Sequence, residues 1–249
     1  MLDRLQAAAA TSRSVAGVAA ILEKGRVTTI VFEIADKELE AILSNRVFLY
    51  TLFGRLMGEE PTEALLELLR DVQTADELAF FGDTPSHYAE LLALAADETT
   101  TLDMLLSEYA YFFSGPGSLP SPPWESVHIS GRRQIFQEST LDVRNFYRSQ
   151  GFLPAAYPHV ADDHIAIELN FMAALSARSL ARLHEKDPTS LEYTLKKQAE
   201  FLDTHLLTWI DSFVAGLEHQ SRTGPFYILA ARSVACFIGK DKELLEELL

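Results

Sequence analysis

The chain has 249 residues, of which 48% are hydrophobic, so it is long enough to form one large or two small domains around a sizeable core. Its net charge of −15 argues against nucleic-acid binding, which depends on Lys and Arg, and favours basic partners. A single cysteine, Cys236, excludes an internal disulfide and a cysteine-based zinc site, and no apolar run is long enough for a transmembrane helix. Asp3 lies where an export signal requires positive charge, so we expect a cytoplasmic protein without stable membrane insertion.

Residues 1–34 differ from the rest of the chain in charge and in pattern. They hold four basic and three acidic residues, a net charge of +1, which leaves −16 on the remainder. Residues 6–10 favour a helix, and the β-branched run 27–34 favours a strand, although no partner strand is evident later. We interpret residues 1–34 as an N-terminal extension and residues 35–249 as the folded domain.

From residue 36 onward, apolar residues recur at helical spacing almost throughout. Caps, glycines and prolines mark the boundaries: Asp187-Pro188 restarts a helix, and Gly151 is placed to end one. The predicted helices cover residues 36–58, 61–69, 88–95, 101–113, 130–150, 162–184, 188–219 and 226–239, with a short turn after residue 241. The sequence therefore predicts an all-α class, as a single globular domain of about nine helices.

The predicted helices are interrupted by a stretch with four prolines, residues 108–128, which cannot continue as a helix or a central strand. Its prolines are Pro116, Pro120, Pro122 and Pro123. The stretch carries few charges and ends in Trp124, which is unusual for a solvated loop. Two interpretations remain open: a stiff connector with a buried anchoring tryptophan, or the rim of a binding groove.

Possible metal ligands are densest at the start of the helix predicted for residues 162–184. They are His159, Asp162, Asp163, His164 and Glu168. The spacing argues against a metal site, because the two histidines do not share a helix face and because Asp162 or Asp163 is explained as a helix cap. Glu125 and His128 form only one Glu-x-x-His pair, whereas a di-iron bundle needs two.

Motifs for nucleotide binding or nucleophilic catalysis are missing from the sequence. Cys236 lies on an apolar stripe, where a thiol is usually buried and inert. We therefore expect a protein that is not an enzyme and that carries no cofactor.

A binding function fits the aromatic residues better. Tyr109, Phe112, Phe113 and Trp124 can line an apolar groove, and aromatic anchors flanked by carboxylates suit a basic, partly apolar peptide. The alternative is that these aromatic side chains belong to the core, which is the usual place for Phe112 and Phe113. The Asp163-His164 pair either caps a helix or presents a charge and a titratable group to a ligand.

Two motifs resemble the signatures of the TorD/DmsD family, which are cytoplasmic chaperones for the maturation of molybdopterin-containing redox enzymes. The first comprises Tyr109, Phe112, Gly115-Pro116 and the run from Pro122 to Val127. The second is the Asp163-His164 pair that opens a helix about forty residues further on. The resemblance covers residues 40–240 and implies an all-helical fold in which the two motifs lie near each other.

The resemblance implies that the chain binds the twin-arginine leader and the apo form of an exported molybdopterin oxidoreductase, assists cofactor insertion and prevents premature export. We expect a monomer or a homodimer. The implied peptide-binding residues are Trp124, Pro122, Pro123, Glu125, Ser126, Asp163, His164, Tyr109 and Phe112. The alternatives are a helical metal-dependent enzyme that uses His159, Asp163 and His164, and an adaptor for another basic partner.

Overall fold

The computed structural model describes residues 36–80, 86–115, 118–155, 160–219 and 224–249. These residues form an all-helical structure, as predicted, and the only β-pairing among them is one isolated bridge. The helices are α2 (Asp36–Gly58), α3 (Glu63–Arg70), α4 (Val72–Leu78), α5 (Ser86–Ala96), α6 (Leu102–Tyr109), α7 (Glu125–Ser130), α8 (Glu138–Ser149), α9 (Ile165–His184), α10 (Pro188–Phe201), α11 (Leu207–Glu218) and α12 (Phe226–Leu248). Two π-helical segments, η3 (Ala110–Ser114) and η4 (Leu202–Leu206), follow α6 and α10.

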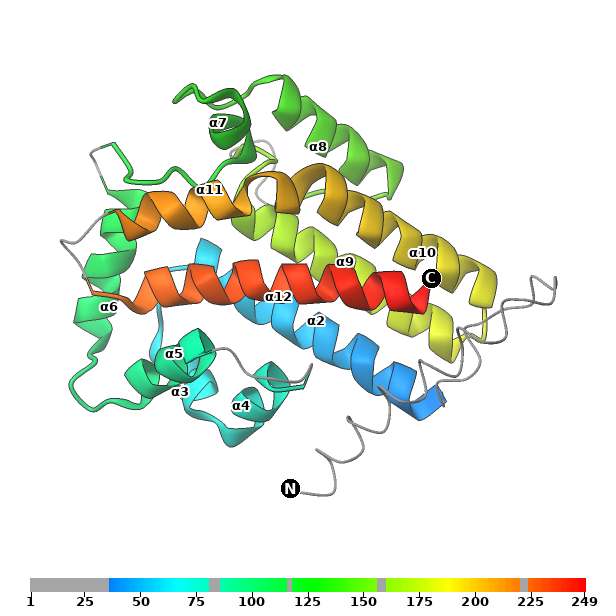
Figure 1. Ribbon diagram of the computed structural model, residues 1–249, viewed down its shortest axis with the longest axis horizontal. Helices are drawn as coiled ribbons and strands as arrows, with labels where there is room; N and C mark the ends of the chain where they lie inside the picture. Colours follow the sequence, from blue (N-terminus) through cyan, green and yellow to red (C-terminus); the bar gives the residue numbers. More distant parts are fainter. Residues whose placement is uncertain (1–35, 81–85, 116–117, 156–159, 220–223) are drawn as a thin grey trace.

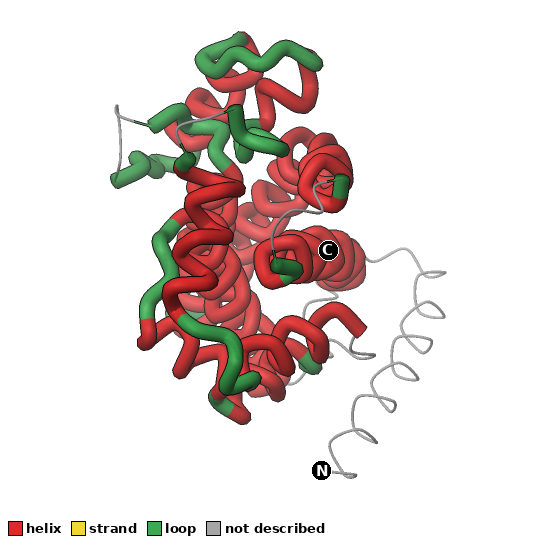
Figure 2. The backbone as a smooth tube through the Cα atoms, turned by 90° about the vertical axis from the view of Figure 1, so that its left-hand side faces the viewer, coloured by secondary structure: helices red, strands yellow, loops and turns green. Residues whose placement is uncertain are grey.

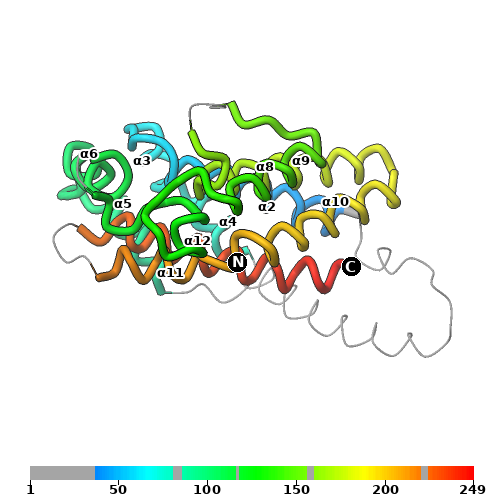
Figure 3. The backbone as a smooth tube through the Cα atoms, turned by 90° about the horizontal axis from the view of Figure 1, so that it is seen from above, coloured from blue at the N-terminus to red at the C-terminus, as the bar shows by residue number. Residues whose placement is uncertain are grey.

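The long helices lie along the long axis of the molecule. Helices α2 and α9 pack against each other, α10 packs on α9, and α12 lies across α2 (Figure 1). Helix α6 runs across one end of this bundle, roughly perpendicular to the long helices (Figure 2). Seen from above, the turn between α9 and α10 lies at the opposite end of the molecule (Figure 3). Each long helix contributes fully buried aromatic rings to one continuous core, among them Phe53, Phe171, Phe201, Phe213 and Phe237.

A buried ion pair joins the first and last described helices. Arg46 of α2 donates from Nε to Oδ1 of Asp241 in α12 at 2.5 Å, and the hydroxyl of Tyr50 donates to Oδ2 at 2.5 Å. All three residues are fully buried. Burial, reinforced by the neighbouring Asp241 carboxylate, raises the pKa of Tyr50 well above its ordinary value, so the phenol keeps its proton.

Several local signals mark helix boundaries as predicted. Asp187 caps α10 by accepting from the backbone N–H of Ser190 at 3.0 Å, and Pro188 occupies the first turn. Thr101 caps α6 in the same way. Gly151 follows α8 with φ 68°, the left-handed conformation expected of a C′ glycine.

Other predicted boundaries were wrong. The helix predicted from Ser130 begins at Glu138; Ser130 instead ends α7, a short helix that Gly131 terminates with φ 65°. The helix predicted to stop near Gly239 continues to Leu248 because buried apolar residues on both sides of the glycine hold it in the core. A mid-helix glycine costs only about 1 kcal/mol, so packing overrides it.

The remaining differences concern short elements that the sequence did not predict. Helices α4 and α7 were not predicted, and the single helix predicted for residues 188–219 contains the π-helical segment η4. The N-terminal extension, with its predicted helix and strand, lies outside the described residues. Among the helices that the structure does describe, none is long and apolar enough to cross a lipid bilayer.

Candidate functional site

The two sequence motifs meet directly in the structure. Trp124 and His164 form an antiparallel β-bridge, and their rings contact edge to face with centroids 5.4 Å apart. On either side, Glu125 N–H donates to the Asp163 carbonyl at 2.9 Å, and Ile165 N–H donates to the Pro123 carbonyl at 2.9 Å. The proximity that the resemblance implied is therefore confirmed. We call this pairing of residues 122–126 with residues 162–165 the junction.

The Asp-His pair caps two different helices. Asp163 Oδ2 accepts from Ser126 N–H at 2.9 Å, in the first turn of α7, whereas His164 Nδ1 accepts from Ala166 N–H at 3.2 Å and is the N-cap of α9. The prediction that Asp162 or Asp163 caps α9 was therefore wrong. The junction turns the Asp163 carboxylate away from α9 and toward the N–H groups that α7 leaves unpaired. Burial lowers the pKa of His164 to about 4, so its imidazole is neutral and Nδ1 is free to accept.

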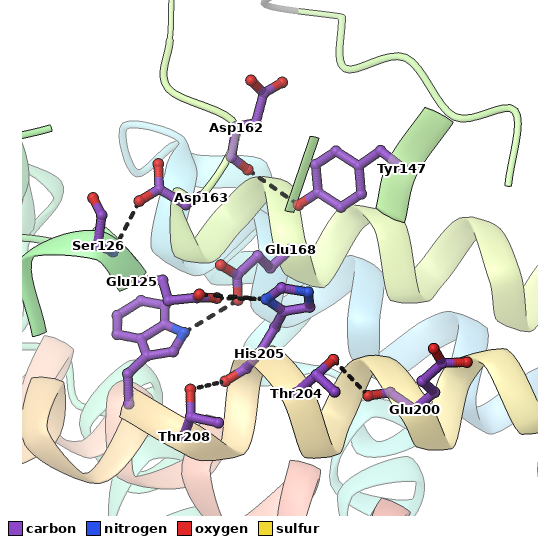
Figure 4. A network of polar contacts seen from close by, with 11 residues as sticks. Glu125, Ser126, Tyr147, Asp162, Asp163, Glu168, Glu200, Thr204, His205 and Thr208 are labelled. Carbon is purple, nitrogen blue, oxygen red and sulfur yellow. Dashed lines mark hydrogen bonds and ion pairs between the residues drawn. The ribbon is translucent and has the colours of Figure 1, made fainter. Parts of the chain in front are cut away.

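Asp162 secures the neighbouring helix α8. Arg144 lies 2.6 Å from the Asp162 carboxylate. The Tyr147 hydroxyl donates to the Asp162 carbonyl at 3.1 Å (Figure 4). Both partners come from α8, so this one residue holds that helix against the start of α9.

A buried group of acidic side chains lies beneath the junction. The carboxylate of Glu125 in α7 lies within hydrogen-bond distance of His205 Nδ1, at 3.0 Å, and Glu168 of α9 accepts from Trp209 Nε1 at 3.3 Å (Figure 4). Burial raises the pKa of Glu125, and burial together with the charges of Glu125 and Asp163 raises the pKa of Glu168 well above its ordinary value. This shift favours the protonated form of Glu168 and so lowers the charge that the group carries.

His128 has a structural role. Its Nε2 donates to the Pro122 carbonyl at 2.8 Å, its Nδ1 lies 3.0 Å from Ser212 Oγ of α11, and its ring stacks on Trp209. Burial lowers the pKa of His128, which keeps the ring neutral for this double contact. Because Glu125 pairs with His205 instead, Glu125 and His128 do not act as a joint metal-binding pair.

The predicted peptide-binding residues divide by exposure. Pro122, Trp124 and His164 are partly exposed at the junction, while Pro123, Glu125, Ser126 and Asp163 are buried beneath them. Tyr109 and Phe112 lie away from the junction in α6 and η3, where Phe112 is fully buried and Tyr109 packs on Tyr227 of α12. Pro116 and His159 lie outside the described residues.

Three polar atoms at the junction are buried without a hydrogen-bond partner among the described residues. They are Nε1 of Trp124, Oγ of Ser126 and Oδ1 of Asp163. Buried polar groups in native proteins are nearly always paired, so such atoms mark places where a ligand or ordered water completes the structure. The three residues belong to the set that the sequence singled out, but the involvement of His205 and Trp209 was not predicted, because both lie on apolar helical stripes that are typical of a core.

We expect Asp163→Ala to lower the free energy of unfolding by about 1–3 kcal/mol, because it removes the cap of α7 and leaves Ser126 N–H buried and unpaired. Asp163→Asn retains an oxygen that can accept this bond and serves as the matched control. Urea titrations followed by circular dichroism measure the difference. Equal midpoints for the alanine and asparagine variants would contradict the capping role.

The described residues include no group of three His, Cys, Asp or Glu side chains placed to hold a metal ion. Within the predicted ligand set, Asp162 pairs with Arg144, Asp163 caps α7 and His164 uses Nδ1 to cap α9. Each of these bonds engages an oxygen or nitrogen atom that could otherwise bind a metal.

Comparison with known proteins identifies the family. The family model described as "Nitrate reductase delta subunit" matches residues 82–215. The probable Tat proofreading chaperone DmsD of Haemophilus influenzae is 26% identical, over 77% of this chain and 90% of its own length. The chaperone protein TorD of Vibrio cholerae is 24% identical, over 86% and 97%.

Two further matches are shorter or more distant. The Tat proofreading chaperone DmsD of Salmonella typhi is 30% identical over 56% of this chain and 62% of its own length. A solved structure of a putative redox enzyme maturation protein from Archaeoglobus fulgidus covers 81% of this chain and 93% of its own, with 21% identity and a TM-score of 0.44. The curated relatives are chaperones and not enzymes, in agreement with the prediction from sequence. The chain belongs to the TorD/DmsD family of redox-enzyme maturation chaperones.

Proposed function

We propose that this chain acts in the cytoplasm on an exported molybdopterin-containing oxidoreductase, binding its twin-arginine leader and its apo form. It shields the apoenzyme until the cofactor has been inserted, and so prevents premature export. The observation that carries the proposal is similarity, over most of the chain, to a probable Tat proofreading chaperone, DmsD, and to the chaperone protein TorD. We infer that it works as a monomer or a homodimer, in which helical elements can be exchanged between protomers.

The junction supports leader binding on physical grounds. A twin-arginine leader joins two arginines to an apolar stretch, and residues 35–249 carry a net charge of −16 that attracts the arginines. Near the junction, Ile129, Ile135 and Phe136 are 51%, 42% and 59% exposed, an apolar surface on which the second part of a leader can pack.

We assign the peptide contacts to Trp124, Pro122 and His164, the partly exposed members of the predicted set. The buried residues beneath them, Pro123, Glu125, Ser126 and Asp163, hold these contacts in place, and Tyr109 and Phe112 act from the core. Burying a few leader side chains gains about 1.5–3 kcal/mol each, less the cost of ordering the peptide, which corresponds to an affinity on the order of micromolar.

The test is calorimetric titration of the protein with synthetic twin-arginine leaders. We expect micromolar binding with a negative change in heat capacity, weakened about tenfold or more by Trp124→Ala because the variant removes the largest apolar contact surface. Tyr193→Ala is the control, because Tyr193 is an aromatic residue of α10 that is 53% exposed and far along the chain from the junction.

The same titration separates this proposal from the alternative of a general adaptor for basic partners. A leader whose apolar stretch is replaced by polar residues should lose most of its affinity for a leader-binding chaperone. An adaptor that recognises charge alone would bind both peptides equally. If leaders from several redox-enzyme classes all failed to bind the folded protein, the proposed function would be wrong.

A further inference from the structure

A second candidate binding surface lies on the other side of α11 from the junction. It is an open groove of about 560 Å³ between α5, the C-terminal end of α11 and the first turns of α12. Its floor is apolar, formed by Leu94, Ile228 and Leu229. Its rim carries the carboxylates of Glu90, Asp97 and Glu218. The volume falls in the range typical of ligand sites.

The charges of the groove select for a cation. Among the described residues that line it, three are carboxylates and one, Arg232, is basic, which leaves two negative charges in excess. Hydrogen bonds from Thr99, through its hydroxyl and its backbone N–H at 2.7 and 2.8 Å, lower the pKa of Asp97 and keep it ionised. Arg232 Nε lies 2.5 Å from Glu218, so the rim already holds one guanidinium.

An apolar floor beneath a carboxylate rim matches the arginine side chain in particular. The three methylene groups of arginine bury against apolar surface while the charged head stays at the edge, and the planar guanidinium can form two parallel hydrogen bonds to one carboxylate. Lysine matches the charge but not this geometry.

The position of the groove relates it to the junction. Helix α11 contacts both α7 and α12 and lies between them (Figure 1). Ser212, which bonds His128 of α7, and Glu218, on the groove rim, lie six residues apart on α11, or about 9 Å along its axis. A peptide must also cross α11, which is about 10 Å wide, and an extended peptide advances about 3.3 Å per residue, so roughly five or six residues join the two surfaces.

We propose that the groove between α5 and α12 binds the arginine pair of the client leader, while the adjacent apolar stretch of the leader packs at the junction. This inference rests on the proposed function and places the two halves of one ligand on two surfaces. Glu90 and Asp97 receive the guanidinium groups, and Leu94 and Ile228 support the arginine stems.

A double-mutant cycle tests the proposal, with calorimetric titration of two peptides into two proteins. The peptides are a leader and the same leader with both arginines replaced by glutamine; the proteins are the full chain and its Glu90→Gln/Asp97→Asn variant. We expect the variant to bind the natural leader about tenfold more weakly, but to bind the arginine-free leader as the unmodified protein does.

The control variant, Glu63→Gln/Glu67→Gln, removes the same net charge from two exposed positions of α3 that do not line the groove. It should change leader affinity by less than about twofold, because exposed charges further away are screened by salt. All of these substitutions are at exposed side chains, so the variants should keep the fold.

Arg232→Gln provides an independent arm. Removing the resident guanidinium frees Glu218, so this variant should bind the natural leader about threefold more tightly. If the leader binds but the groove variant and the control weaken it equally, the groove is not the arginine site and the chaperone function stands. If no leader binds the unmodified protein, the proposed function fails and this inference fails with it.

Discussion

Replacing Asp241 with leucine should lower the free energy of unfolding by about 3–5 kcal/mol, the largest effect that we expect from a single substitution. Asp241 accepts from Arg46 Nε at 2.5 Å and from Arg46 Nη2 at 3.0 Å, and it also accepts from the Tyr50 hydroxyl. Without it, a guanidinium remains fully buried among apolar side chains with no counter-charge. The substitution also removes the polar connection between α2 and α12.

Urea denaturation followed by circular dichroism measures this loss, and the double variant Arg46→Met/Asp241→Leu is the informative control. Exchanging a whole buried ion pair for apolar residues of similar size is often nearly neutral, so the double variant should recover most of the stability. A single variant within 1 kcal/mol of the unmodified protein would show that the buried charge finds water or another partner.

Glu168→Gln should stabilise the protein at neutral pH, and the gain should grow with pH. Glu168 is fully buried, and its pKa in the folded state is raised well above the ordinary carboxyl value of 4.5. At pH values between 4.5 and the raised pKa of the folded state, the unfolded chain releases the proton while the folded protein retains it. The folded protein therefore loses relative stability as the pH rises through this range. Each pH unit over which the unfolded chain has released the proton and the folded protein still holds it corresponds to about 1.4 kcal/mol.

Glutamine is the appropriate replacement because it carries the polar atoms of a protonated acid and can still accept from Trp209 Nε1. Thermal or urea unfolding of both proteins at several pH values between 5 and 7.5 measures the difference. Glu67→Gln, at an exposed carboxylate of α3, should show no such pH-dependent gain. Parallel stability curves for Glu168→Gln and the unmodified protein would mean that Glu168 is ionised in the folded state.

The local features of the chain could be read from the sequence. Apolar spacing identified the all-α class, and single residues marked helix ends: Asp187 before Pro188, Thr101 at the start of α6 and Gly151 after α8. These signals work because a cap or a C′ glycine acts through backbone groups within about four residues of itself. The two motifs identified the family for a similar reason, since each lies within one local stretch of the chain.

Long-range pairing could not be read in this way. The sequence suggested that Asp163 serves its own helix, yet its carboxylate caps α7, whose first residues lie 37 positions earlier. Arg46 finds Asp241 across 195 positions, and Glu125 finds His205 across 80. No local pattern encodes these partners, because a charged residue in a helix is expected to be exposed. Only the packed fold shows that it is buried.

The sequence by itself thus determined the helical class, many of the helix ends and the family to which the chain belongs. Only the tertiary structure decided that Asp163 and Glu168 are buried, that His164 rather than an aspartate caps α9, and that a carboxylate-rimmed groove lies beside α11. The physical reason is one of range. Helix propensity and capping act between chain neighbours, whereas burial, pKa shifts and grooves arise from residues that only the packed fold brings together.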